Sequence, residues 1–104
     1  MKKMILVGVL SALSSASNAA EVTQADVCRE LGDLSVKIMT ARQNGIPLST
    51  MLEALNDDTA VANHMKQVII EAYKQPRYST DEMRARTIED FRNDVELECF
   101  QAAN

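Results

Sequence analysis

The chain is too short for more than one domain and too acidic for most roles on nucleic acids or anionic membranes. It has 104 residues, with 15 acidic against 11 basic side chains and a formal charge of −4. This length predicts a single small domain. A negative domain repels phosphate backbones and anionic lipid head groups, and no basic run follows Lys2-Lys3 to offset this. We therefore predict no nucleic-acid binding.

The N-terminal residues have the three-part pattern of a secretory signal. Met1–Lys3 is positively charged, Met4–Leu13 is apolar, and Ser17-Asn18-Ala19 supplies small residues for cleavage. The apolar run falls well short of the about 20 residues that a membrane-spanning helix needs. We predict that residues 1–19 are removed and that residues 20–104 form one domain, periplasmic or secreted, without stable membrane insertion. Losing Lys2 and Lys3 lowers the basic count from 11 to 9 against 15 acidic residues, so the formal charge moves from −4 to −6.

A first helix is predicted from about Thr23 to Asn44. Thr23 is followed three residues later by Asp26, which is close to a capping box. Asn44-Gly45 supplies a left-handed stop, and Pro47 prevents continuation. Apolar side chains at helical spacing predict a buried stripe of Val27, Leu31, Leu34 and Ile38.

Two shorter helices are predicted next. The second follows Pro47 with Ser49 or Thr50 as its cap, and it is too short to be stable unless it docks on other helices. Its apolar positions are Leu48, Met51, Leu52 and Leu55. The third runs from about Thr59 to Lys74, with Asp58 as its cap and Pro76 beyond its end. Its predicted buried face comprises Val61, Met65, Val68, Ile69, Ala72 and Tyr73.

A last helix is predicted from about Thr80 to Gln101, beginning with a capping box of Ser79 and Glu82. Its apolar stripe is Ile88, Phe91, Val95 and Cys99. No stretch alternates long enough to predict a strand. The predicted fold class is all-α, a small four-helix domain in which the first and last helices are antiparallel.

The two cysteines of the chain, Cys28 and Cys99, are predicted to form a disulfide. A small exported chain with two cysteines favours this pairing over two free thiols. The antiparallel arrangement also brings the start of the first helix beside the end of the last. Closing a ring of about 70 residues would contribute about 4 kcal/mol through loop-closure entropy.

The sequence offers no convincing catalytic or metal-binding set. His64 is the only histidine, and the disulfide would consume both thiols, which removes a thiol nucleophile and the thiolate ligands of a metal site. A hydrolase could use Glu89 and Asp90, but neighbouring residues point in different directions on a helix. We predict that the protein is not an enzyme and has no metal and no cofactor.

The pattern of residues resembles small uncharacterised exported proteins of Gram-negative bacteria and their phages. The resemblance rests on an early cysteine, the run Ala41-Arg42-Gln43-Asn44-Gly45-Ile46-Pro47-Leu48-Ser49, then Ala72-Tyr73 with Pro76, and finally Phe91 and Cys99. It implies export and a helical fold with one disulfide, and it brings no activity. In size, helix content and single disulfide, the chain is also similar in layout to periplasmic acid-stress chaperones.

The favoured functional hypothesis is a protein-binding module of inhibitor, immunity or adaptor type whose partner is another periplasmic protein. Arg77 and Tyr78, in the turn after the third helix, and Met51 are the candidate interaction surface. The alternative is an acid-conditional chaperone, because protonation of the excess carboxylates would weaken ion pairs and expose Met51, Leu52 and Leu55. The sequence leaves open whether the domain forms a homodimer.

Overall fold

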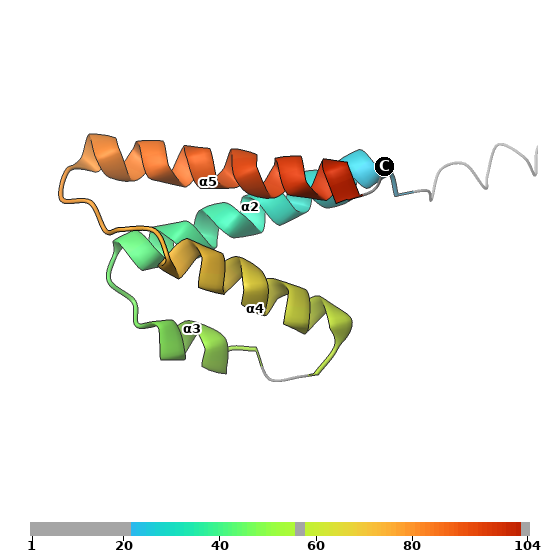
Figure 1. Cartoon of the computed structure of the whole chain (residues 1–104), viewed down its shortest axis with the longest axis horizontal. Coiled ribbons are helices and arrows are strands. Elements are labelled where there is room, and N and C mark those ends of the chain that lie inside the picture. The colour runs from blue at the N-terminus through green and yellow to red at the C-terminus, as the bar shows by residue number, and fades with distance from the viewer. Residues whose placement is uncertain (1–21, 56–57, 103–104) are drawn as a thin grey trace, which may run out of the picture.

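The structure, a computed structural model, describes residues 22–55 and 58–102 and is helical without strands in those ranges. Its elements are α2 (Gln24–Gln43), α3 (Leu48–Glu53), α4 (Ala60–Tyr73) and α5 (Asp81–Ala102) (Figure 1). The predicted all-α class with four helices is confirmed. The predicted signal and its cleavage site, within residues 1–19, lie outside the described residues.

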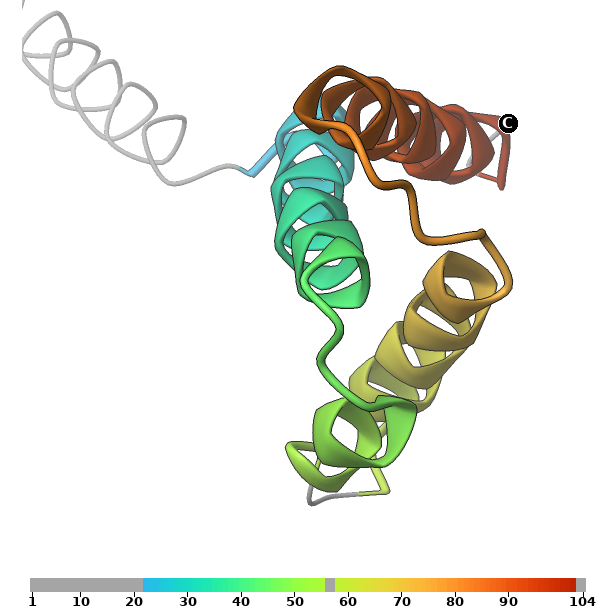
Figure 2. The same cartoon turned by 90° about the vertical axis from the view of Figure 1, so that its left-hand side faces the viewer.

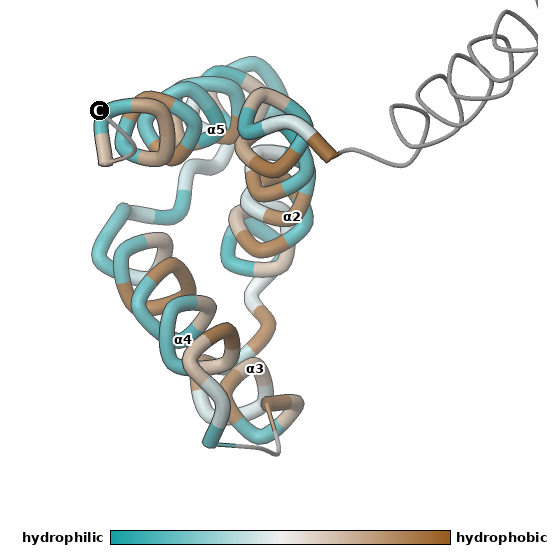
Figure 3. The backbone as a smooth tube through the Cα atoms, turned by 90° about the vertical axis from the view of Figure 1, so that its right-hand side faces the viewer, coloured by the Kyte–Doolittle hydropathy of each residue, from teal (hydrophilic) through white to brown (hydrophobic). Residues whose placement is uncertain are grey.

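Helix α2 is the central element of the fold. It packs closely against α5 along one side and against α4 along another, while α3 packs against α4. Helices α4 and α5 make few contacts with each other. Two opposite views show α4 and α5 apart from each other beside α2 (Figures 2 and 3). The four helices therefore form an angular, open arrangement rather than a closed bundle.

The predicted disulfide and the antiparallel pairing of the first and last helices are confirmed. Cys28 in the second turn of α2 is bonded to Cys99 in the last turn of α5, with a Cα–Cα distance of 5.5 Å and a sequence separation of 71. The cystine joins the end of α5 to the start of α2, and Cys28 is fully buried.

The capping signals of α2 act as predicted. The Asp26 N–H donates to Thr23 Oγ1 at 3.2 Å, and the Thr23 N–H donates to Asp26 Oδ2 at 3.3 Å, which completes a capping box. At the other end Gly45 has φ 84°, and the Ile46 N–H donates back to the Ala41 carbonyl at 3.0 Å. This bond and the positive φ of Gly45 are the features of a Schellman motif, which provides hydrogen-bond donors for the last carbonyls of the helix.

The predicted caps of α4 and α5 are wrong by one residue. Thr59, not Asp58, caps α4, and its hydroxyl accepts from the Ala62 N–H at 3.1 Å. Thr80, not Ser79, accepts from the Met83 N–H at 3.2 Å at the start of α5. Asp58 and Ser79 could also cap a helix. In each case it is the following threonine whose hydroxyl accepts from the amide three residues ahead.

The predicted cap of α3 is also wrong. The helix begins directly after Pro47, whose ψ of 146° is extended, and it has no side-chain cap. Ser49 and Thr50 therefore lie inside its first turn. Proline can precede a helix in this way because its fixed φ already suits the entry and its missing N–H is not needed there.

The buried face of α2 differs from the predicted stripe. Val27 and Leu34 are 51% and 42% exposed, whereas Ile38 is buried. Small and flexible side chains occupy the buried face instead: Cys28, Gly32, Ser35 and Met39. The reason is the close approach of α5, since a Cβ at Gly32 would overlap the Glu96 side chain. Small residues on this face leave room for side chains of α5 such as Glu96.

The hydrophobic core is small and lies where α2, α4 and α5 meet. Its buried members are Ile38, Met39, Val68, Ile69, Ala72, Phe91 and Val95, and Met51 and Leu52 of α3, with Leu55 just after that helix, pack against them and are partly buried. Val61 was expected in this core but is 73% exposed. It lies in the first turn of α4, at the end of that helix far from α2 (Figure 1), so no helix covers it.

Candidate functional site

A groove of about 1000 Å³ lies between α4 and α5, and its lining also includes one α2 residue, Leu31. The buried side chains Val68, Phe91 and Val95 form its floor, and Leu97 on its margin is 56% exposed. Its remaining lining residues are His64, Gln67, Glu71, Gln75, Asp94, Glu98, Cys99, Gln101 and Ala102. The groove exists because α4 and α5 both pack on α2 but not on each other.

The charged side chains that line the groove are all carboxylates. Glu71, Asp94 and Glu98 line it, and none of the described residues that line it is lysine or arginine. Lys74 Nζ lies 3.1 Å from Glu71 Oε1 and partly neutralises that carboxylate. Asp94 and Glu98 take part in none of the ion pairs among the described residues. The α5 wall of the groove is therefore negative at neutral pH.

A buried glutamine holds the connection from α4 to α5 in place. Gln43 is 1% exposed, and its Nε2 donates to the Pro76 carbonyl at 2.9 Å while its Oε1 accepts from the Tyr78 N–H at 2.8 Å. Sequence reasoning missed this residue. The only signal was its spacing, since Gln43 lies one turn after Met39 on the face of α2 that proves to be buried.

Further bonds join the C-terminal ends of α2 and α4. Arg42 Nε donates to the Gln75 carbonyl at 3.0 Å, and the Tyr73 hydroxyl donates to the Ile46 carbonyl at 2.7 Å. Burial raises the pKa of the Tyr73 phenol. The two helices are therefore joined at these ends, and α4 diverges from α2 toward its own N-terminus (Figure 1).

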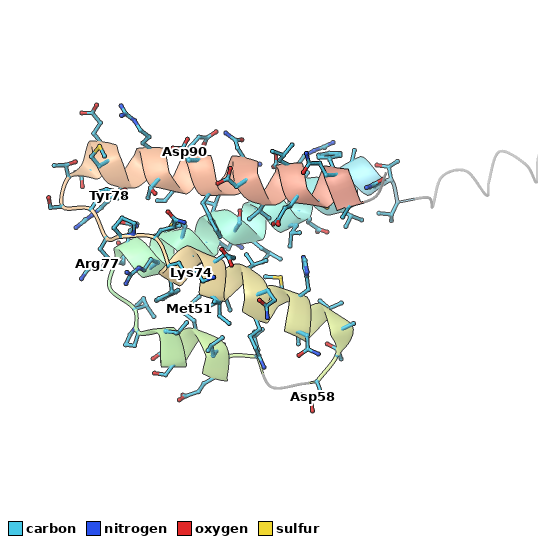
Figure 4. The ribbon with its side chains drawn as sticks, viewed as in Figure 1. Met51, Asp58, Lys74, Arg77, Tyr78 and Asp90 are labelled. Carbon is cyan, nitrogen blue, oxygen red and sulfur yellow. A yellow bond between two sulfur atoms is a disulfide. The ribbon has the colours of Figure 1, made fainter. Side chains whose placement is uncertain are left out.

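The predicted interaction residues lie outside this groove. Arg77 and Tyr78 lie in the connection between α4 and α5, while Met51 lies on α3 and is partly buried against the core (Figure 4). Arg77 Nε donates to the Gln43 carbonyl at 3.3 Å, and the Tyr78 carbonyl accepts from Arg84 Nε at 2.7 Å. These bonds give Arg77 and Tyr78 a structural role in the connection.

Tyr78 is nevertheless close to the groove. A second hollow of about 260 Å³ is lined by Tyr78 and Asp90 and shares Gln75, Phe91 and Asp94 with the groove. Asp90 belongs to α5 and Tyr78 to the connection that precedes it (Figure 4). The groove therefore continues toward the turn that the sequence singled out.

A polar cluster joins α2 to α5 beside the buried Gly32. Arg92 Nε donates to Glu96 Oε2 at 3.1 Å, and its Nη2 lies 2.9 Å from Asp33 Oδ1. The hydrogen bond to Glu96 and the charges of both carboxylates raise the pKa of the Arg92 guanidinium. The cluster holds the Glu96 side chain over Gly32.

The described residues contain no cluster of side chains suited to a metal ion. Across residues 22–55 and 58–102, no three His, Cys, Asp or Glu side chains lie close enough to hold a metal ion. His64 is exposed on α4. In the same ranges, no helix combines the length and apolar character needed to span a bilayer. The chemistry that the groove can offer is therefore apolar contact flanked by negative charge.

No protein-family model, curated protein sequence or solved structure matches the chain.

Proposed function

We propose that the protein is a periplasmic or secreted protein-binding module of inhibitor, immunity or adaptor type, and that the groove between α4 and α5 receives its partner. The observation that carries this proposal is the apolar floor of Val68, Phe91 and Val95 beneath an open groove between two helices. Grooves of this kind accept helices of other proteins. The proposal replaces the turn residues Arg77 and Tyr78 by the groove as the main contact surface.

The distribution of apolar side chains supports a binding role. Several large apolar residues are exposed although the core is small: Val22, Val27, Leu34, Ile46, Leu48, Val61, Met83, Leu97 and Phe100. Single exposed apolar residues are normal, but groups of them mark contact surfaces. Leu97 of α5 and Leu31 of α2 both line the groove beside its apolar floor. The groove and its margin therefore offer apolar surface on more than one wall.

Affinity capture with a matched variant tests the proposal. The full chain would be expressed with a C-terminal tag, and the exported protein would be recovered from periplasm at neutral pH beside Leu97→Glu. Leu97 is exposed, so this variant should fold and form the disulfide. A stoichiometric partner that binds the wild type and not Leu97→Glu supports the proposal. A partner that both proteins retain equally, or no partner at all, contradicts it.

An acid-conditional chaperone is the second candidate, and the docking of α3 favours it. This helix has no side-chain cap and contains no buried residue, and it is held through the partly buried Met51 and Leu52 together with Leu55, which follows it. Such an element detaches at low cost in free energy and would expose apolar surface. Suppression of the aggregation of an unrelated protein near pH 3, with none at pH 7, would support this role. A fold that is unchanged by circular dichroism near pH 2 to 3, below the usual carboxylate pKa of roughly 4, would contradict it.

A further inference from the structure

We infer that the groove binds a cationic amphipathic helix of its partner, one whose apolar stripe is flanked by lysine or arginine. This inference rests on the proposed binding function and names the chemistry of the partner. It is drawn from three features of the groove: its position between two helices that make few contacts with each other, its length and its charge.

The first feature is the position of the groove among the helices. Helices in a four-helix bundle each touch two neighbours. Here α4 and α5 share α2 as a common neighbour but make few contacts with each other. The lining of the groove comes from α4, α5 and Leu31 of α2. A helix placed on Val68, Phe91 and Val95 would contact both walls and complete a four-helix bundle.

The second feature is the length of the groove. Its α5 wall runs from Phe91 to Ala102, and its α4 wall runs from His64 to Glu71, with Gln75 just beyond the end of α4. At a rise of 1.5 Å per residue, the α5 wall is about 16 Å long, or about three helical turns, and the helical part of the α4 wall is about 10 Å long. Three turns present apolar anchors at i, i+3 or i+4 and i+7, which is the usual spacing of a helix bound in a groove.

The third feature is the sign of the charge. Asp94 and Glu98 are spaced i, i+4 on the α5 wall, and neither takes part in an ion pair within the described residues. A cation on the bound helix would lie beside these exposed carboxylates at the edge of the groove, so that their charges attract it. A second copy of this acidic chain is a poorer occupant, because it would bring like charges together.

Two model helices of equal apolar content test the inference. The probe is a peptide of about 14 residues, Leu-Lys-Lys-Leu-Leu-Lys-Leu repeated twice, which is about 21 Å long when helical. Its control has glutamate in place of every lysine. We expect the lysine peptide to bind the oxidised protein and the glutamate peptide to bind at least about tenfold more weakly. Amide resonance shifts should centre on Leu31, Val68 and Leu97, and binding should weaken when salt rises to about 0.5 M.

Charge reversal on α5 distinguishes binding of the lysine peptide in the groove from its general attraction to an acidic protein. Asp94→Lys with Glu98→Lys should weaken binding of the lysine peptide about tenfold or more. The matched control, Glu82→Lys with Glu89→Lys, makes the same change in charge on the same helix but outside the groove lining, and should change the affinity less than about threefold. Circular dichroism and the intact disulfide would show that both variants are folded.

The outcomes that would overturn the inference differ from those that would overturn the proposed function. Equal losses in both double variants, or resonance shifts spread over the outer face of α5, would show attraction to charge without a groove site. Binding of neither peptide, or a concentration-dependent homodimer whose interface covers the groove, would also overturn it. The capture experiment with Leu97→Glu would still decide whether the groove binds a partner of another chemistry.

Discussion

Removing the Cys28–Cys99 disulfide should destabilise this protein more than any other single perturbation that the structure suggests. The two cysteines are 71 residues apart in sequence. Opening a loop of this size raises the entropy of the unfolded chain and so lowers its free energy by about 4.4 kcal/mol at 25 °C. The core contains few buried apolar residues, and domains of this size are stable by only a few kcal/mol. A loss of about 4 kcal/mol corresponds to a fall in Tm of roughly 15–30 °C.

Urea unfolding followed by circular dichroism would measure this loss. The oxidised wild type would be compared with Cys28→Ala/Cys99→Ala, which avoids placing a hydroxyl at the fully buried Cys28. The m-value should rise in the variant, because its unfolded state is no longer closed into a ring and exposes more surface. Reductant should destabilise the wild type and leave the variant unchanged, which controls for side effects of the reductant.

The position of the disulfide predicts where the variant opens first. Cys28 lies near the start of α2 and Cys99 near the end of α5, far from the Gln43 anchor at the other end of the pair. Hydrogen exchange in the variant should accelerate first in these two helix ends. A loss of stability below about 1 kcal/mol would refute the reasoning, since it would mean that the unfolded chain gains little freedom when the ring is opened.

Three further predictions follow from single residues. Gln43→Ala should cost about 2 kcal/mol in urea unfolding, because it leaves the Pro76 carbonyl and the Tyr78 N–H without their partner; an unchanged midpoint would show that water replaces both bonds. Gly32→Ala should also destabilise, by about 1–2 kcal/mol, because the overlap with Glu96 outweighs the better helix propensity of alanine; greater stability would show that Glu96 moves aside freely. A hydrogen bond with the Thr23 side chain, and a second one from the Thr23 backbone N–H, lower the pKa of Asp26. Its ionised form is therefore favoured by folding, so this stabilisation is present above the unfolded pKa of about 3.9 and is lost as the pH falls through the lower folded value. Asp26→Asn should accordingly melt at a lower temperature than the wild type at pH 7, and the two melting curves should converge near pH 2; a difference that persists there would assign the effect to something other than charge.

The helices and their ends were largely readable from the sequence, because local chemistry decides them. Thr23 with Asp26 starts α2, and Gly45 ends it because a positive φ costs glycine little. The pairing of Cys28 with Cys99 was also predictable, since the order of the helices brings their ends together. Local signals were less decisive where two adjacent residues could both cap, as at the starts of α4 and α5.

The rotation of each helix and the existence of the groove were decided only by tertiary structure. Apolar spacing favoured Val27 and Leu34 as buried residues, but the close approach of α5 requires a face of small side chains, and Gly32 lies on that face. The burial of Gln43 depends on a connection more than thirty residues later in the chain, whose backbone groups need a partner. The groove depends on how few contacts α4 and α5 make with each other. Periodicity within one helix carries information about which residues can share a face, whereas the distance and angle between helices determine which face is covered and which is left open to a partner.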